Sequence, residues 1–308
     1  MREEGFTMRL KYDVDTKILF QIGDPLDQCC ATYLHNALYE FANINAVNLS
    51  VPVPKGGLGD FVKAAKTIHA AGFDLTMPHK TDIIPFLDEC DPASRAFKCV
   101  NHVKIADGRL IGVGLDGAGM GLSLQYEMGD ISGRHALIIG AGAVAGPIAA
   151  DLCSRGVKKF TIVNRTLEKA QYVADTLRNI YGVETSFGPF SEEFLSSVAP
   201  EISLAVQCTC LGGGSHWGQF PHLGFISRLP KNCIAADVLY PTTDFLEEAK
   251  RQGLPTVSGK GMLYQQQLAM MEFYFGVKLG ADALQEAKEA LEVAIAMRTI
   301  RNEKMKEQ

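Results

Sequence analysis

The feature that most constrains the fold is a glycine-rich turn between a buried strand and a helix. The apolar run at residues 136–139 is short and continuous, as expected for a strand buried on both faces. It ends at a G-x-G-x-x-A pattern formed by Gly140, Gly142 and Ala145, which opens a helical apolar pattern. A second apolar run at residues 160–163 completes a strand-turn-helix-strand unit. This unit predicts a parallel sheet whose turn and helix N-terminus can bind a dinucleotide pyrophosphate.

The residues after the second strand indicate which dinucleotide is preferred. NAD sites usually place Asp or Glu there to accept a hydrogen bond from the ribose 2′-hydroxyl. This chain has Asn164 and Arg165, with Lys169 one turn on, and a guanidinium can bind a 2′-phosphate with two parallel hydrogen bonds. The sequence therefore predicts NADP, with NAD less favoured; a solvated surface arginine and a turn without a ligand are the alternatives. The expected cofactor contacts in this unit are Gly140, Gly142, Ala143, Val144, Ala145, Asn164, Arg165, Thr166 and Lys169.

Length, charge and cysteine usage exclude several classes of protein. The 308 residues suffice for two domains, and the net charge of -5 without a basic block favours neither a nucleic-acid nor a membrane surface. The eight cysteines lack the paired spacings of a zinc site, so reduced thiols and no metal are expected. The charged N-terminal segment has no apolar signal core, and no run approaches about eighteen apolar residues. A cytoplasmic protein is therefore expected.

Helix and strand patterns alternate on both sides of the glycine-rich turn. Before it, the patterns predict strands at residues 16–22, 45–53, 73–77 and 96–105, a hairpin at residues 107–108, and helices at residues 32–44, 58–71 and 82–90. After it, they predict helices at residues 167–181, 191–198 and 243–252 and strands at residues 184–187, 204–208, 233–238 and 256–258. Two helical segments, residues 262–275 and 281–306, come last. The prediction is an α/β protein of two domains, residues 1–120 completed by residues 262–308, and residues 121–261.

Lys80 stands where parallel α/β sheets bind their ligands. Pro78 stops the strand at residues 73–77 and leaves His79 and Lys80 on a loop at its carboxyl end. An ordinary surface lysine is the alternative.

Six ordered motifs resemble those of the shikimate/quinate dehydrogenase family over nearly the whole chain. They are residues 74–80 for N-V-T-x-P-x-K, 98–102 for G-A-V-N-T, 116–119 for the end of N-T-D-G-x-G, 140–145 with 164–166 for the nucleotide turn, 207–212 for N-A-T-x-x-G, and 261–266 for G-M-L-x-x-Q. The resemblance implies an N-terminal substrate-binding domain and a C-terminal Rossmann domain that binds NADP across a cleft. It also implies a place in aromatic amino acid biosynthesis.

The resemblance assigns roles to residues on both sides of the cleft. Reduction of a ring ketone builds negative charge on the carbonyl oxygen, and the resemblance implies that Lys80 donates to this oxygen while Asp116 holds the ammonium. Asp116 could also cap the helix that follows it, which its catalytic role does not exclude. Asn101 and Gln266 could either bind substrate hydroxyls or satisfy backbone amides. The other residues implied are Thr76 in the substrate site and Thr209, Tyr240 and Gly261 in the cofactor site.

The chain departs from the family where the substrate carboxylate binds. The family's S-x-S-P-x-x-H-N stretch provides two serine hydroxyls, but here Cys29 and Ala31 replace them, while His35 and Asn36 are kept. Two lost hydrogen bonds to a charged group amount to about 3 to 6 kcal/mol, or roughly a hundred- to ten-thousandfold in affinity. Compensation could come from Thr32 or from Gln28. The predicted residues in this part of the substrate site are Gln28, Cys29 and Ala31.

The expected activity is NADP-dependent, reversible reduction of a ring ketone, either 3-dehydroshikimate or a cyclic substrate without its carboxylate. A non-catalytic NADP-binding sensor is an alternative, which the retention of both Lys80 and Asp116 disfavours. Another alternative, an NADP enzyme for an unrelated substrate such as an acyl-tRNA or a pterin, fits only the second domain. The expected partner is a small cyclic hydroxy or keto compound, with no nucleic acid and no membrane, and the protein is expected to be a monomer or a homodimer.

Overall fold

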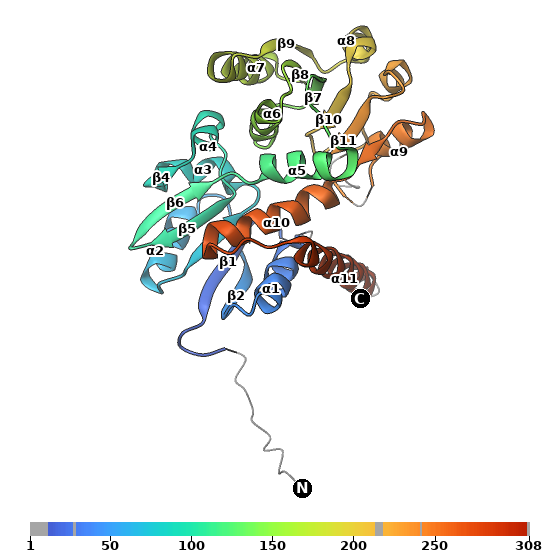
Figure 1. Ribbon diagram of the computed structural model, residues 1–308. Helices are drawn as coiled ribbons and strands as arrows, with labels where there is room; N and C mark the ends of the chain where they lie inside the picture. Colours follow the sequence, from blue (N-terminus) through green and yellow to red (C-terminus); the bar gives the residue numbers. More distant parts are fainter. Residues whose placement is uncertain (1–11, 27–28, 213–217, 241, 307–308) are drawn as a thin grey trace.

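The computed structural model describes residues 12–26, 29–212, 218–240 and 242–306. In this part of the chain, two six-stranded sheets with flanking helices form two lobes. Helices α5 (Asp116–Met128) and α10 (Gly259–Phe275) lie between the lobes (Figure 1). The predicted two-part α/β architecture is confirmed.

The first sheet has the strand order β2-β1-β3-β5-β6-β4. Its strands are β1 (Lys17–Gly23), β2 (Ala46–Pro52), β3 (Gly72–Leu75), β4 (Glu89–Cys90), β5 (His102–Ala106) and β6 (Arg109–Val113). Strands β1, β2 and β3 pair in parallel, whereas β5 pairs antiparallel with both β3 and β6. The helices of this half are α1 (Ala31–Phe41), α2 (Leu58–Thr67), α3 (His79–Asp82) and α4 (Pro92–Phe97).

Three local predictions in this half are wrong. The helix expected at residues 58–71 ends at Thr67, and β3 begins at Gly72. The helix expected at residues 82–90 is a short 3-10 turn, η1 (Ile84–Phe86), followed by β4. The strand expected from residue 96 begins only at His102, because helix α4 precedes it.

Helix α4 has a clear local cause that the apolar pattern hid. The Asp91 carboxylate accepts a hydrogen bond from the Ser94 backbone N–H at 2.9 Å, and Pro92 occupies the first helical turn. Both features favour a helix start, since the cap satisfies a free N–H and proline has none to satisfy. The helix that starts here therefore continues through Phe97, although residues 96 and 97 belong to the apolar pattern that predicts a strand.

The second sheet is parallel throughout and has the strand order β12-β11-β10-β7-β8-β9. Its strands are β7 (His135–Ile139), β8 (Lys159–Asn164), β9 (Glu184–Pro189), β10 (Leu204–Gln207), β11 (Ile234–Asp237) and β12 (Thr256–Val257). Helices α6 (Ala145–Ser154), α7 (Leu167–Tyr181), α8 (Glu192–Val198) and α9 (Asp244–Arg251) complete it, with the short 3-10 turns η2 (Ala199–Glu201) and η3 (Gly224–Arg228). The order reverses at β7, the strand that feeds the glycine-rich turn, as in dinucleotide-binding sheets.

The two last helices return to the first half, as predicted. The Tyr274 hydroxyl of α10 donates to the Phe73 carbonyl oxygen of β3 at 2.9 Å. Helix α11 (Ala281–Lys306) packs against α1, where Leu34 and Leu291 share one apolar cluster. Helix α5 runs without interruption through residue 120, the position at which we expect the domain boundary. The two halves are therefore connected by continuous helices.

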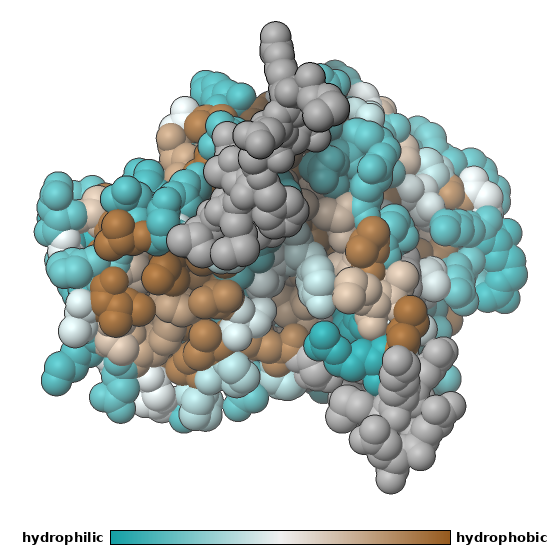
Figure 2. Space-filling model, turned by 90° about the horizontal axis from the view of Figure 1, so that it is seen from below, coloured by the Kyte–Doolittle hydropathy of each residue, from teal (hydrophilic) through white to brown (hydrophobic). Residues whose placement is uncertain are grey.

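Some large apolar side chains stay exposed, among them Leu49, Val293 and Met297. On the face seen from below, hydrophobic residues gather into a patch that hydrophilic residues border (Figure 2). Apolar patches of this kind often mark contact surfaces. Within the described residues, no helix combines the length and the apolar character that a membrane span requires.

Candidate active site

A cleft of about 300 Å³ lies between the two halves and collects most of the predicted catalytic and substrate-site residues, together with Tyr240 of the predicted cofactor site. Those that line it are Cys29, Ala31, Thr76, Lys80, Asn101, Asp116, Tyr240 and Gln266. Gln28 lies outside the described residues. Residues that are far apart in the sequence thus meet in one concave site, and small ligands usually bind in such sites.

Lys80 is fixed by the short helix α3 rather than by the expected loop. The neighbouring His79 is buried and its Nε2 donates to the Val53 carbonyl oxygen at 2.7 Å. The backbone N–H of Val100 donates to the Lys80 carbonyl oxygen at 2.9 Å. These two contacts hold the backbone at His79 and Lys80 in place, and the Lys80 side chain lines the cleft.

Lys80 and Asp116 form an ion pair inside the cleft. Lys80 Nζ donates to Asp116 Oδ2 at 2.7 Å, and the side chains are 15% and 4% exposed. Burial alone would lower the pKa of Lys80, but the charge and the hydrogen bond of Asp116, together with contributions from Cys99 and Cys29, outweigh it and the pKa is raised. The lysine is therefore a cation at neutral pH. The alternative of Asp116 as a helix cap is wrong, because the cap position of α5 is Leu115.

Asn101 and Gln266 hold the Asp116 carboxylate from two sides. Asn101 Nδ2 donates to Asp116 Oδ1 at 3.1 Å, and Gln266 Nε2 donates to the same oxygen at 2.7 Å. The Asn101 Oδ1 atom also accepts from the Leu115 backbone N–H at 2.8 Å. The two amides therefore orient the carboxylate, and each NH₂ group has a second N–H that can serve a substrate hydroxyl.

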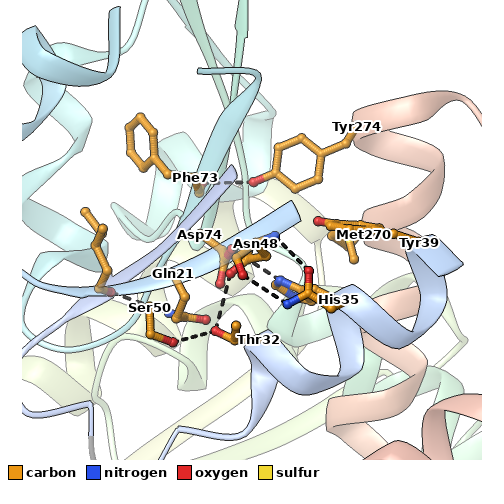
Figure 3. Close-up of polar contacts among 12 residues, drawn as sticks. Gln21, Thr32, His35, Tyr39, Asn48, Ser50, Phe73, Asp74, Met270 and Tyr274 are labelled. Atoms are coloured by element: carbon orange, nitrogen blue, oxygen red, sulfur yellow. Dashed lines mark hydrogen bonds and ion pairs between the residues drawn. The ribbon is translucent and has the colours of Figure 1, made fainter. Parts of the chain in front are cut away.

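The expected carboxylate-binding stretch has few hydrogen-bond donors. Burial raises the pKa of the Cys29 thiol to about 12, so the group is a neutral and weak donor. Ala31 contributes no polar side-chain atom. The Thr32 hydroxyl is 2.6 Å from the Ser50 hydroxyl and donates to Asn48 Oδ1 at 3.3 Å (Figure 3). Thr32 is therefore engaged by β2 and is not among the residues that line the cleft.

The glycine-rich turn fits a dinucleotide. Gly140 has a φ of +101°, and a Cβ there would lie 2.7 Å from Thr209 Cγ2, so only glycine suits the turn. A Cβ on Gly142 would meet no atom within 4 Å, which leaves space beside the start of α6. Asn164 Oδ1 accepts from the Ala141 backbone N–H at 3.1 Å and fixes the loop. The turn thus combines a shape set by glycine with room for a phosphate at a helix N-terminus.

The remaining predicted cofactor residues lie at four places in the nucleotide half and at its boundary. Arg165, Thr166 and Lys169 are exposed and follow the carboxyl end of β8. Ala143, Val144 and Ala145 continue the turn into α6. Thr209 Oγ1 accepts from the Leu211 backbone N–H at 3.1 Å. A Cβ on Gly261 would lie 1.9 Å from Ser123 Oγ, so this glycine lets α10 approach α5 closely.

Five further polar residues line the cleft although no role is predicted for them: Gln21, His35, Asp74, His102 and Gln267. His102 faces Asp74 across the antiparallel register of β3 and β5. Both are polar residues within apolar strand runs, which is the signal in the sequence that could have identified them. Gln267 follows Gln266 on α10 and carries no comparable signal.

Comparison with known proteins agrees with this geometry. Residues 21–103 match the family model described as the shikimate dehydrogenase substrate binding domain, and residues 123–192 match that of shikimate / quinate 5-dehydrogenase. A relative from Methanococcus aeolicus, named shikimate dehydrogenase (NADP(+)), is 31% identical over 274 residues, which cover 88% of this chain and 96% of the relative. The chain belongs to the shikimate/quinate dehydrogenase family.

The chain is also similar to solved structures of enzymes whose names give different substrates. The ligand-free 5-ketofructose reductase of Gluconobacter sp. strain CHM43 has a TM-score of 0.79 and 28% identity, covering 91% of this chain and 99% of the reductase. A shikimate dehydrogenase in complex with NADP+ has a TM-score of 0.80 and 27% identity, covering 91% and 96%.

Proposed function

We propose that this chain is an NADP-dependent oxidoreductase that reversibly reduces a ring ketone to the alcohol. The observation that carries the proposal is the Lys80–Asp116 ion pair, held by Asn101 and Gln266 in a cleft between the two halves. The relative named shikimate dehydrogenase (NADP(+)) supports it. In this proposal, residues 1–120 and 262–308 bind the substrate and residues 121–261 bind NADP.

NADPH, when bound, supplies the hydride that adds to the carbonyl carbon. The chain's own residues act on the carbonyl oxygen, where negative charge develops. Lys80 has three N–H bonds, of which one donates to Asp116 and the others can reach the substrate oxygen. The ammonium stabilises the developing alkoxide and transfers a proton to it. Asp116 keeps Lys80 charged and in position, while Asn101 and Gln266 keep Asp116 in position.

The cofactor contacts follow from the geometry of the nucleotide half. The open space at Gly142 and the N-terminus of α6 suit the pyrophosphate. Arg165 and Lys169 are exposed cations beside the end of β8, where the adenosine ribose of a dinucleotide lies in sheets of this kind. They favour a 2′-phosphate, and so NADP over NAD.

The substrate is a small cyclic hydroxy or keto compound. A carboxylate would meet Cys29 and Ala31 where the family has two serine hydroxyls, which favours substrates without that group. The likeness to a 5-ketofructose reductase supports this, since 5-ketofructose carries no carboxylate. The retained catalytic pair argues against a non-catalytic NADP sensor. We further propose that the protein is a monomer or a homodimer, which light scattering of the purified chain would decide.

The test is a substrate panel with both cofactors. Shikimate, quinate and fructose are offered with NADP+, and 3-dehydroshikimate and 5-ketofructose with NADPH, each repeated with the NAD form. Turnover of at least one of these compounds, faster with the NADP form, is the expected result. Tight NADPH binding without turnover on a broad ketone panel would instead support the sensor.

A further inference from the structure

The wall of the cleft contains three buried side chains with unsatisfied polar atoms. Both ring nitrogens of His35 and of His102, and both amide atoms of Gln267, have no hydrogen-bond partner among the described residues. Each side chain is at most 2% exposed, and all three line the cleft. An unpaired buried polar group costs roughly 1 to 3 kcal/mol. Their concentration at this one place is therefore unfavourable for stability and calls for a role in binding.

The distribution of such atoms supports a local cause. Elsewhere in the described part of the chain, the unpartnered buried side-chain atoms are only Nδ1 of His79 and Oγ1 of Thr185. The set in the cleft comes from three separate elements, because His35 lies on α1, His102 on β5 and Gln267 on α10. Chance clustering of unsatisfied groups from three elements is disfavoured, since most buried polar groups in folded proteins are paired.

The two histidine rings are close enough for one small ligand to reach both. Their centroids are 6.3 Å apart. His35 Nδ1 lies 3.5 Å from Asp74 Oδ1, which is too long for a strong hydrogen bond. That Asp74 oxygen already accepts from Asn48 Nδ2 at 2.9 Å (Figure 3). The ring nitrogens therefore remain available to a ligand.

These groups are uncharged at neutral pH. Burial lowers the pKa of His35 to about 4, an effect that the neighbouring amide of Gln267 only partly opposes. Burial, helped by His35 and Lys80, holds the pKa of His102 well below its usual value. A neutral imidazole donates from one nitrogen and accepts at the other, and a carboxamide does both. This mixture matches hydroxyl groups, which also donate and accept, whereas a carboxylate only accepts.

A negative charge would find no compensation at this wall. Among the described residues that line the cleft, Lys80 is the one cation, and it is already paired with Asp116. Arg298 of α11 donates to Cys30 Sγ at 3.4 Å and is not among the lining residues. A buried carboxylate without a paired cation is strongly unfavourable.

We propose that His35, His102 and Gln267 form a hydroxyl-binding wall that selects a neutral, polyhydroxylated ring substrate over one that carries a carboxylate. The proposal rests on the oxidoreductase function proposed above and names the substrate class of that same site. The three residues bind substrate, while Lys80 and Asp116 carry out the proton transfer.

The test compares two alcohols that differ only in charge: shikimate and its analogue with a hydroxymethyl group in place of the carboxylate. Oxidation by NADP+ is measured for the wild type, for Gln267→Met, which keeps the side-chain length, and for His102→Thr, which introduces the threonine of the family motif. We expect the wild type to prefer the neutral analogue. Each variant should lose about tenfold in kcat/KM for the analogue, mainly through KM, with a smaller loss for shikimate.

The matched control is Thr185→Val, which removes an unpartnered buried hydroxyl far from the cleft. Its ratio of kcat/KM for the two alcohols should equal that of the wild type. A wild-type preference for shikimate, or an unchanged ratio in the variants, would overturn the proposal. If one variant does not fold, the other carries the comparison, and if neither folds, the wild-type preference decides.

Failure of the proposed function would look different. A wild type that binds NADPH but turns over neither alcohol nor any other compound of the substrate panel would defeat the oxidoreductase proposal alone. The wall is then tested by binding, because the neutral analogue should raise the melting temperature of the wild-type NADP complex more than shikimate does. An equal shift with both compounds, or a larger one with shikimate, would overturn the selectivity proposal as well.

Discussion

Lys80 and Asp116 lie 36 positions apart in the chain, yet their side chains share a hydrogen bond of 2.7 Å. Lys80 follows β3 of the first sheet and Asp116 begins the helix that leaves it. Gln266, another 150 positions on, donates to the same carboxylate. The charge of Lys80 therefore depends on contacts that only the complete fold brings together.

Replacing Lys80 tests its part in the chemistry. Lys80→Met removes the proton donor but keeps the aliphatic stem, so kcat should fall by about a hundred- to ten-thousandfold while NADPH affinity changes little. Stopped-flow turnover and NADPH fluorescence titration measure the two quantities. Lys104→Met is the control, because Lys104 belongs to the same half and donates to the Phe273 carbonyl oxygen instead of lining the cleft. Undiminished turnover in Lys80→Met would remove this lysine from the mechanism.

Removing the carboxylate should change the pH dependence rather than only the rate. In the wild type, Asp116 raises the pKa of Lys80 against the effect of burial. In Asp116→Asn the charge of Asp116 is lost while the larger effect of burial remains, so the pKa of Lys80 falls. The cation is then lost at a lower pH, and the alkaline decline of ketone reduction should move to lower pH in the variant. A pH profile with its alkaline limb unmoved would show that Asp116 does not control this proton.

Gly142 and Gly140 should respond differently to the same substitution. Gly142→Val places a side chain in open space, so the melting temperature should stay near the wild-type value while NADPH binding is lost. Gly140→Val forces a β-branched residue to a φ of +101° against Thr209 and should destabilise the fold by roughly 1 to 3 kcal/mol. Calorimetry and cofactor titration of both variants separate the effects. Normal NADPH affinity in Gly142→Val would place the phosphates elsewhere.

The strands and helices of the nucleotide half could be predicted because the local sequence patterns agree with the structure that these segments form in the fold. Residues 136–139 are fully buried, and the apolar run that marks them needs no distant partner to be read as a strand. Helix α7 has the predicted bounds, because Gly182 ends it in a left-handed conformation. The first half was harder, since Asp91 and Pro92 start a short helix that extends into the first residues of a run that looks like a strand.

In the candidate site, too, some residues were predicted from the sequence and others were not. The family motifs point to Lys80, Asp116, Asn101 and Gln266. In the fold, the other three side chains all donate hydrogen bonds to the Asp116 carboxylate. The residues of the hydroxyl-binding wall were missed because their role depends on their neighbours in space; His102, for example, lies beside Asp74 only through the β3–β5 register. A polar residue in a buried strand is visible in the sequence, but what it faces is not.

Arg165 is expected to set the cofactor preference. A charge-assisted hydrogen bond to phosphate contributes roughly 1.5 to 3 kcal/mol, so Arg165→Ala should raise the KM for NADP+ by roughly ten- to a hundredfold. The KM for NAD+ should stay unchanged, because NAD+ has no 2′-phosphate to lose. Arg178→Ala is a suitable control, since Arg178 lies at the far end of α7 and pairs with Asp175. Equal changes for both cofactors would indicate that Arg165 is an ordinary surface residue.

Asp237, at the end of β11, should make stability depend on pH in an unusual direction. Burial raises the pKa of its carboxyl group to about 7, although Leu239 N–H and the Thr243 hydroxyl donate to it at 2.9 and 2.7 Å. The folded state therefore holds a proton that the unfolded state releases near pH 4. The stabilisation is complete below that pH and is lost as the pH rises toward 7, at up to about 1.4 kcal/mol per pH unit.

Asp237→Asn removes this proton while retaining an oxygen that accepts from Leu239 and an amide that can donate to Thr243. The free energy of unfolding of the variant relative to the wild type should therefore rise between about pH 4 and about pH 7. Urea denaturation at several pH values measures the difference, and the other titrating groups cancel because both proteins contain them. A difference that stays constant with pH, or that falls, would mean that Asp237 is ionised in the folded protein throughout this range.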